Sequence, residues 1–190
     1  MKESSKAMER RFNSEKSVLF SKIFQGAGID IGAGDDLIKV DGVVGFDMED
    51  GDANHLDQYF PKESFDYIHA SQCLEHMHDP KAALKSWLKV LKKGGYAVIS
   101  VPSWELYEGM IWPSRFNPDH KSTWSFWMPE SPAPTHVCLP QWTVNFSDCN
   151  LIYCDLIDTN YNYKIGTSVD QTYPYENRVE AFIEFVLQKR

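Results

Sequence analysis

The segment GIDIGAGDD, residues 28–36, places carboxylates around a glycine turn. Gly32 and Gly34 follow a short apolar run, as at the end of a strand where the backbone approaches a ligand closely. Asp30 precedes the turn, and two more acids follow it. Three carboxylates beside a pyrophosphate would be electrostatically costly. The third glycine of a G-x-G-x-x-G dinucleotide turn is also missing, because Leu37 stands there. The turn therefore favours a cationic ligand that carries no phosphate.

S-adenosylmethionine offers the groups that such a turn can bind: an α-amino group, a sulfonium and a ribose diol. Asp30 is expected to pair with the amino group, directly or through water. Asp47 ends the segment VVGFD and is placed to accept hydrogen bonds from the ribose hydroxyls. Asp52, in GDANHL, is placed to accept one from the adenine amino group. The alternatives are a turn-capping role for Asp30 and a merely solvated loop around Asp47 and Asp52.

The elements that must position these acids alternate between strands and helices. Residues 5–24 have the pattern of one or two amphipathic helical pieces. Strand patterns cover residues 27–32, 43–48, 65–71 and 96–102. The segment 79–95 predicts a helix that Asp79 caps and the Gly94-Gly95 pair ends. This alternation predicts an α/β fold with a doubly wound, Rossmann-like and mostly parallel sheet.

The length of 190 residues predicts a single domain, 1–190. Its expected parts are an N-terminal helical cap, a cofactor-binding core, an acceptor-site insertion or lid, and C-terminal sheet elements, over residues 1–25, 26–103, 104–147 and 148–190. The insertion is rich in tryptophan and proline. The final segment, RVEAFIEFVLQKR, begins with helical charge spacing and ends like an edge strand, so its structure stays open at this point.

Five segments resemble motifs of class I S-adenosylmethionine-dependent methyltransferases. DIGAG is similar to the D/E-x-G-x-G motif, VVGFD to the second-strand acid, and GDANHL to the G-D-A adenine segment. SFDYIHASQCLEHMHDP resembles the fourth-strand segment that ends in L-E-H, and WLKVLKKGGYAVISVP resembles the helix and strand around R-V-L-K-P-G-G. The pieces follow the family order over roughly residues 26–103. The resemblance implies S-adenosylmethionine as cofactor and S-adenosylhomocysteine as product.

The resemblance also implies a cofactor site, made of Asp30, Gly32, Ala33, Gly34, Asp47, Met48, Asp52, Ala53, Ser71 and Gln72. The chain departs from the family in two places. Asp36 stands where the family has its third glycine, and only four residues separate Asp47 from Asp52, where the family usually has a helix and a strand. The sheet is therefore expected to be shortened after its second strand.

Two histidines are the candidate catalytic residues. Methyl transfer needs alignment of donor and acceptor, and it needs a base only where the acceptor loses a proton. His76 occupies the L-E-H position and His120 follows the fifth strand. A structural hydrogen bond is the alternative for both. His76 and His78 are not expected to bind a metal, since residues two apart on a helix point to different sides and no third ligand is evident.

The acceptor is expected to contact the insertion. Arg115 and Lys121 are candidates to hold a phosphate or carboxylate of the acceptor, and Trp112 and Trp124 are candidates to wall a sugar or an aromatic ring. The alternative for the tryptophans is a satellite hydrophobic core. At the N-terminus, the pair Arg10-Arg11 either touches an anionic acceptor or lies on a solvated helix face.

The predicted function is methyl transfer from S-adenosylmethionine to oxygen or nitrogen of a small-molecule or sugar-type acceptor, by in-line displacement. The net charge of −8 disfavours nucleic acid as a partner. The charged N-terminal segment and the short apolar runs predict a cytoplasmic protein that does not bind membranes. The alternatives are an inactive S-adenosylmethionine-binding module and a nucleotide-dependent oxidoreductase. The oligomeric state stays open.

Overall fold

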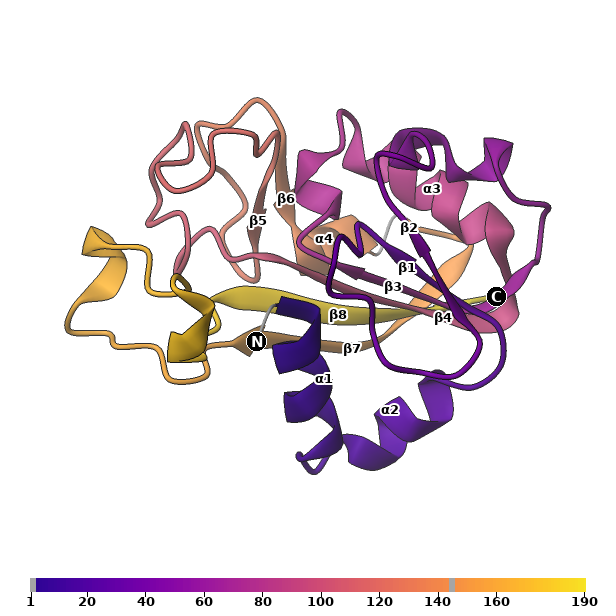
Figure 1. The fold of residues 1–190 in the computed structure, drawn as a ribbon. Helices are drawn as coiled ribbons and strands as arrows, with labels where there is room; N and C mark the ends of the chain where they lie inside the picture. The colour runs from indigo at the N-terminus through magenta and orange to yellow at the C-terminus, as the bar shows by residue number, and fades with distance from the viewer. Residues whose placement is uncertain (1–2, 144–145) are drawn as a thin grey trace.

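A six-stranded sheet runs through the computed structural model, which describes residues 3–143 and 146–190 (Figure 1). Its strands lie in the order β2-β1-β3-β4-β8-β7. They are β1 (Gly28–Ile31), β2 (Val43–Phe46), β3 (Phe65–Ser71), β4 (Leu91–Pro102), β7 (Cys149–Ile157) and β8 (Phe182–Lys189). The first four are mutually parallel, and β8 is antiparallel to both β4 and β7. The α/β prediction with a mostly parallel sheet is confirmed.

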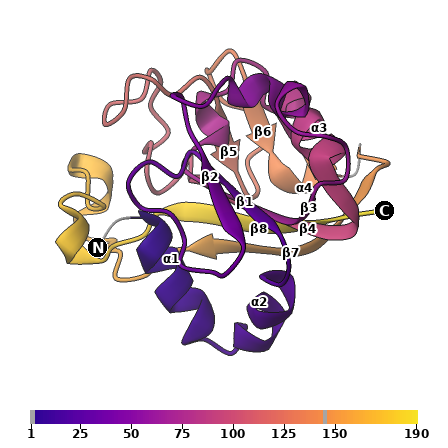
Figure 2. The same cartoon turned by 45° about the vertical axis from the view of Figure 1, so that its right-hand side comes forward.

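Helices cover both faces of this sheet. The α-helices are α1 (Glu3–Phe12), α2 (Ser17–Ile23), α3 (Pro80–Val90) and α4 (Leu139–Thr143). Four short 3-10 helices are η1 (Ala53–Gln58), η2 (Leu74–His76), η3 (Gly166–Ser168) and η4 (Tyr175–Asn177). Figures 1 and 2 show α3 on one face of the sheet and the α1–α2 pair on the other. No helix in the described ranges has both the length and the apolar character needed to cross a membrane.

Each face of the sheet has its own hydrophobic cluster. On β4, the side chains of Ala97 and Ile99 join the large cluster under α3, which includes the fully buried Trp87. Val98, between them, joins the smaller cluster around Phe20 of α2. Because successive strand residues point to opposite faces, the continuously apolar pattern of β4 reflects a strand covered on both sides.

The helix α3 begins as predicted and ends earlier than predicted. The Asp79 carboxylate accepts hydrogen bonds from the backbone N–H groups of Lys81 and Ala82. The helix stops at Val90, and β4 starts at Leu91. The Gly94-Gly95 pair therefore lies inside the strand, and its predicted role as the end of the helix is wrong.

Two further features of the sheet can be compared with the sequence. The connection from β2 to β3 contains only η1, and β2 is an edge strand, so the shortening after the second strand is confirmed. The C-terminal segment is the strand β8, which lies between β4 and β7. Its edge-like and helical sequence features were misleading, because its charged Glu184 is buried against arginines of α1.

The segment after β4 folds against the end of the sheet. It contains a small parallel pair of strands, β5 (Thr123–Ser125) and β6 (His136–Cys138). The backbone of Trp124 bridges to Ser103 at the end of β4. The segment between β7 and β8 carries η3 and η4 and extends at the side of the molecule near the N-terminus (Figure 1).

Candidate active site

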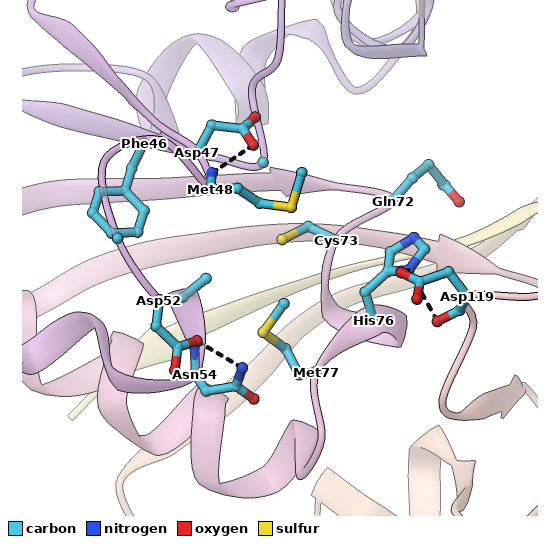
Figure 3. Close-up of a pocket in the computed structure, with 13 residues that line it drawn as sticks. Phe46, Asp47, Met48, Asp52, Asn54, Gln72, Cys73, His76, Met77 and Asp119 are labelled. Carbon is cyan, nitrogen blue, oxygen red and sulfur yellow. Dashed lines mark hydrogen bonds and ion pairs between the residues drawn. The ribbon is translucent and has the colours of Figure 1, made fainter.

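The direction of strand addition reverses at β1, which has β2 on one side and β3 on the other. In open α/β sheets, ligands bind outside the carboxyl ends of the strands at such a switch point. A cavity of about 410 Å³, here called the switch-point cavity, lies there (Figure 3). Its lining consists of Gly32, Phe46, Asp47, Met48, Gly51, Asp52, Ala53, Asn54, Gln72, Cys73, His76, Met77 and Asp119.

The glycine turn after β1 is fixed by close backbone approach. Gly32 has a φ of +71°, and a Cβ there would lie 2.8 Å from Cβ of Cys73. Any other residue would strain the backbone and push away the segment after β3. The backbone N–H of Gly34 donates to Oδ2 of Asp47 at 2.6 Å, so the turn is tied to the end of β2.

Asp30 lies beneath the turn and does not line the cavity. It is buried, its Oδ2 accepts a hydrogen bond from the backbone N–H of Ile38, and its Oδ1 lies 2.6 Å from Nδ1 of His69. Nε2 of His69 lies 2.9 Å from Nη1 of Arg11, which can only donate, so Nδ1 of His69 donates to Asp30. These hydrogen bonds are those of the turn-capping alternative for Asp30, and its contact with the ligand's amino group, directly or through water, stays a prediction.

Two other predicted acids do line the cavity. Oδ1 of Asp47 accepts the backbone N–H of Met48 at 2.7 Å. Oδ1 of Asp52 accepts hydrogen bonds from the side chain and the backbone N–H of Asn54, and these lower the pKa of the Asp52 carboxyl. Both acids are therefore hydrogen-bond acceptors in the lining, across the cavity from His76 and Asp119 (Figure 3). Ala53 lies beside them in the lining.

The remaining predicted cofactor residues lie close by. Ala33 and Ser71 line a smaller hollow beside the same glycine turn, which also includes Gln72. Gln72 has a φ of +56°, and its Nε2 is buried without a hydrogen-bond partner among the described residues. Gly34 lines neither space and acts through its hydrogen bond to Asp47.

Sequence reasoning missed six lining residues, namely Phe46, Gly51, Asn54, Cys73, Met77 and Asp119. Five of them directly adjoin predicted positions, and their neighbours Asp47, Asp52, Ala53, Gln72 and His76 were the available signal. Asp119 directly precedes the predicted His120, but its place in the switch-point cavity depends on the path of the insertion through the tertiary fold.

A second cavity of about 250 Å³, here called the side cavity, adjoins the first. Its lining consists of Glu3, Gln72, Glu75, His76, Tyr107, Asn117, His120, Thr172, Tyr175 and Phe182. Gln72 and His76 line both cavities. The side cavity draws residues from α1, from the insertion and from the segment before β8, so its lining depends on parts of the chain that are far apart in sequence.

The two candidate catalytic histidines are brought together in this region. The rings of His76 and His120 have centroids 5.0 Å apart. Nδ1 of His76 lies 2.9 Å from the Asp119 carboxylate, and Nδ1 of His120 lies 2.6 Å from the Glu108 carboxylate. Because a carboxylate accepts, each Nδ1 carries the proton, and Nε2 of each neutral ring keeps a lone pair. Both Nε2 atoms face the carboxyl of Glu75. Glu75 is fully buried, and this burial raises the pKa of its carboxyl.

The predicted acceptor residues of the insertion behave differently. Trp124 is fully buried, with its Nε1 donating to Ser122, so its predicted contact with an acceptor is wrong; it belongs to the main hydrophobic cluster and not to the satellite core of the alternative. Trp112 is half-buried and lines neither cavity. Arg115 donates to the backbone carbonyl of Thr167. Lys121 pairs with Asp119 through its amine.

The N-terminal arginines are structural. Arg11 is fully buried, and its guanidinium donates to the Glu184 carboxylate. Arg10 donates to Glu180 and to Glu184. The two side chains therefore attach α1 to the β8 region. They line neither the switch-point cavity nor the side cavity, and they do not form a solvated helix face, so neither expectation for Arg10 and Arg11 matches.

Comparison with known families identifies the class. A family model described as a methyltransferase domain matches residues 9–143. The chain therefore belongs to the methyltransferase-domain family, with S-adenosylmethionine as methyl donor. No curated protein matches the chain.

Solved structures share the fold at low sequence identity. A chain from the complex between the Haloferax volcanii Trm112 methyltransferase activator and a methyltransferase is 15% identical, with a TM-score of 0.57 and coverage of 97% of this chain and 92% of that one. An S-adenosylmethionine-dependent methyltransferase from Thermotoga maritima is 19% identical, with a TM-score of 0.54 and coverage of 97% and 95%. The YcgJ protein from Bacillus subtilis is 16% identical, with a TM-score of 0.52 and coverage of 91% and 96%.

The switch-point cavity fits this methyl donor. Three of its lining residues, Asp47, Asp52 and Asp119, are acids, and no lysine or arginine is among the lining residues of the described chain. That charge suits a sulfonium and an ammonium group better than a phosphate. Phe46 and Met77 supply apolar surface for an aromatic base, and the buried amide of Gln72 supplies an unused donor.

Proposed function

We propose that this methyltransferase acts on oxygen or nitrogen of a small-molecule or sugar-type acceptor that binds in the side cavity. The observation that carries the proposal is the junction of the two cavities at Gln72 and His76. An acceptor in the side cavity would meet the methyl group of a donor in the switch-point cavity at these two residues. Proximity and orientation of this kind supply most of the catalysis that an activated sulfonium requires.

The donor contacts follow from the residues of the switch-point cavity. S-adenosylmethionine supplies a methyl group that its sulfonium already activates. We assign the adenine to the space beside Asp52 and Met77, and the ribose to the space beside Asp47. The methionine portion then extends past the glycine turn toward Gln72, whose Nε2 is free to donate to the α-carboxylate. These assignments place the sulfur near the junction of the cavities.

The acceptor has to lose a proton when its oxygen, or a protonated nitrogen, is methylated. The lone pairs nearest the junction are on Nε2 of His76 and Nε2 of His120, since each Nδ1 donates to a carboxylate. A histidine held by a carboxylate is a suitable proton acceptor near neutral pH. We therefore propose that Nε2 of His76 or Nε2 of His120 accepts the proton that the acceptor loses.

Small acceptors suit the side cavity better than macromolecules do. The cavity is lined by three separate parts of the chain, and Tyr107 and Phe182 contribute apolar walls. The net charge of −8 opposes a nucleic-acid partner. We therefore expect methyl transfer to a molecule small enough to enter the cavity.

The proposal can be tested with radiolabelled S-adenosylmethionine and a cell extract separated by size. The expected result is label in the fraction of small molecules. Label confined to the protein or nucleic-acid fractions would overturn the acceptor assignment, whereas the donor assignment would stand.

A matched pair of variants locates the acceptor. Tyr107 lines the side cavity but neither the switch-point cavity nor the hollow of Ala33 and Ser71, and Tyr163, an exposed tyrosine, lines none of the three. With the acceptor found in the extract, Tyr107→Ala is expected to raise the KM for the acceptor severalfold and to leave the Kd for S-adenosylmethionine unchanged. Tyr163→Ala is expected to leave both unchanged. An unchanged KM in Tyr107→Ala would contradict binding in the side cavity.

A further inference from the structure

The side cavity contains a buried carboxylate that has no hydrogen-bond partner among the described residues. Glu75 has an exposed fraction of 0%, and neither Oε1 nor Oε2 accepts a hydrogen bond from any described residue. A second buried oxygen close by, Oε2 of Glu108, is also unpartnered in the described chain. Unpaired buried carboxylates are costly, and native structures pair them with cations or hydrogen-bond donors. The site therefore has an unmet requirement for positive charge.

Two imidazole nitrogens face the same carboxylate. Nε2 of His76 lies 3.7 Å from Oε1 of Glu75, and Nε2 of His120 lies 3.9 Å from it. These distances are too long for hydrogen bonds. The three candidate ligand atoms lie within 4.8 Å of one another. Ligands bound to tetrahedral Zn²⁺ at about 2.0–2.1 Å stand about 3.4 Å apart, so the widest separation would have to close by up to about 1.4 Å, or about 0.7 Å for each of its two atoms, for all three to bind one ion.

The opposite nitrogen of each ring is already held. Nδ1 of His120 donates to Glu108, and Nδ1 of His76 donates to Asp119. A carboxylate on the far nitrogen is the usual support of a metal-binding histidine, because it fixes the tautomer and directs the lone pair. The support is buried for His120, whose side chain and that of Glu108 are 3% and 2% exposed. The backbone N–H groups of Lys121 and Ser122 donate to the carbonyl of Glu75, which fixes the third ligand against the insertion.

We propose that Glu75, His76 and His120 form a binding site for a divalent transition-metal ion, with Zn²⁺ as the best match. Two imidazoles and one carboxylate suit Zn²⁺ better than they suit Mg²⁺ or Ca²⁺, which prefer oxygen ligands. Three protein ligands leave at least one position open, as in catalytic zinc sites. All three ligands line the side cavity, so the open position faces the space assigned to the acceptor.

The consequence for the reaction rests on the proposed function. A hydroxyl of the acceptor would occupy the open position, and the ion would lower its pKa so that the proton passes to solvent. The oxygen then forms the bond to the methyl carbon, and the carbon–sulfur bond breaks with its electron pair left on sulfur. In this arrangement the two histidines hold the ion, and they do not receive the proton themselves. The site thus favours O-methylation among the alternatives.

The test is Zn²⁺ binding by the untagged full-length chain, which needs no acceptor and no donor. The protein is stripped with a chelator, titrated with Zn²⁺ by calorimetry, and analysed for metal content after gel filtration. The variants are Glu75→Gln, His120→Ala and Glu108→Gln, and the matched control is His78→Ala, an exposed histidine two residues from His76. Binding of Co²⁺ in place of Zn²⁺ reports the ligands by its visible absorption.

The expected result is one Zn²⁺ per chain, with binding at least 100-fold weaker in Glu75→Gln and His120→Ala and unchanged in His78→Ala. Glu108→Gln is expected to weaken binding by about 10- to 100-fold, as for other residues that support a ligand. Co²⁺ should show d–d bands without a thiolate charge-transfer band. Circular dichroism and S-adenosylmethionine binding establish that each variant is folded.

Two results would overturn the proposal. One is the absence of stoichiometric Zn²⁺ binding by the folded wild-type chain. The other is binding that survives in Glu75→Gln and His120→Ala, which would place the ion elsewhere. In either case, the proposed acceptor cavity would stand, and Nε2 of His120 would return to the role of proton acceptor.

Discussion

The substitution Glu184→Gln tests how α1 is attached to the sheet beside the active site. Glu184 lies on β8 with an exposed fraction of 0%, and its carboxylate accepts hydrogen bonds from Arg10 and Arg11. The residue at the start of α1, Glu3, lines the side cavity, so attachment of this helix also shapes the acceptor site. Glutamine keeps the size of the side chain and removes its charge, which leaves the buried Arg11 unpaired.

The magnitude follows from the charge balance. Burial alone would raise the pKa of Glu184, but the charges of Arg11 and Arg10 and their hydrogen bonds outweigh it and lower the pKa from 4.5 to about 2. At about 1.4 kcal/mol for each pH unit, this fall corresponds to about 3 kcal/mol of stability. That value agrees with the roughly 3–5 kcal/mol lost when one partner of a buried ion pair is removed. Because the pKa is lower in the folded state, the contribution is fully present above pH 4.5 and is lost as the pH falls toward 2.

The assay is urea unfolding at several pH values for the wild type, Glu184→Gln, Arg11→Met and the double variant. Glu184→Gln should lose about 3 kcal/mol at pH 7, and the loss should shrink as the pH falls from 4.5 to about 2. The free energy of unfolding should fall less in the double variant Glu184→Gln/Arg11→Met than the two single losses add up to, because neither charge of the pair is then left without its partner. A loss under about 0.5 kcal/mol at pH 7, the size of an ordinary surface substitution, would refute the reasoning.

Three further predictions concern individual residues. Trp124→Ala should lower the free energy of unfolding by about 3–5 kcal/mol and leave the Kd for S-adenosylmethionine unchanged by calorimetry, because Trp124 is a core residue; a selective loss of donor binding would contradict this. Asp30→Ala should cost about 1–3 kcal/mol in urea unfolding and weaken donor binding through the glycine turn, and wild-type values for both would refute its turn-capping role. Burial raises the pKa of the Cys73 thiol, so mass spectrometry should find Cys73 unalkylated at pH 8 in the native protein and alkylated in urea; modification in the native protein would argue against the buried position.

The sequence was sufficient to predict the elements whose signals are local. The apolar runs before Gly32 and around Ile68 are buried strands, and Asp79 caps α3, because each pattern depends only on neighbours in the chain. The five methyltransferase-like segments are also local patterns, and their order along the chain predicted the methyltransferase family. Asp47 and Asp52 follow β2 directly, so their position at the carboxyl edge of the sheet could also be inferred.

The features that the sequence could not predict depend on distant contacts. Glu184 looks like a solvated residue of an edge strand, and only Arg11, at the other end of the chain, makes its burial possible. Trp124 has the type expected in a sugar site, but its position under β8 places it in the core. The proposed metal ligands Glu75 and His76 are neighbours in the chain, but His120 comes from an insertion whose path no local pattern indicates, so the group of three was not evident from the sequence.

The methyl-donor site at the switch point is tested most directly by calorimetric titration of S-adenosylmethionine and S-adenosylhomocysteine into the wild type, Asp47→Ala and Asp41→Ala. Asp47 lines the switch-point cavity, and Asp41 is an exposed acid outside it. Both nucleosides are expected to bind the wild type and Asp41→Ala equally, and Asp47→Ala is expected to bind them at least tenfold more weakly. Failure of the wild type to bind either nucleoside, or equal affinities in all three proteins, would contradict a methyl-donor site at the switch point.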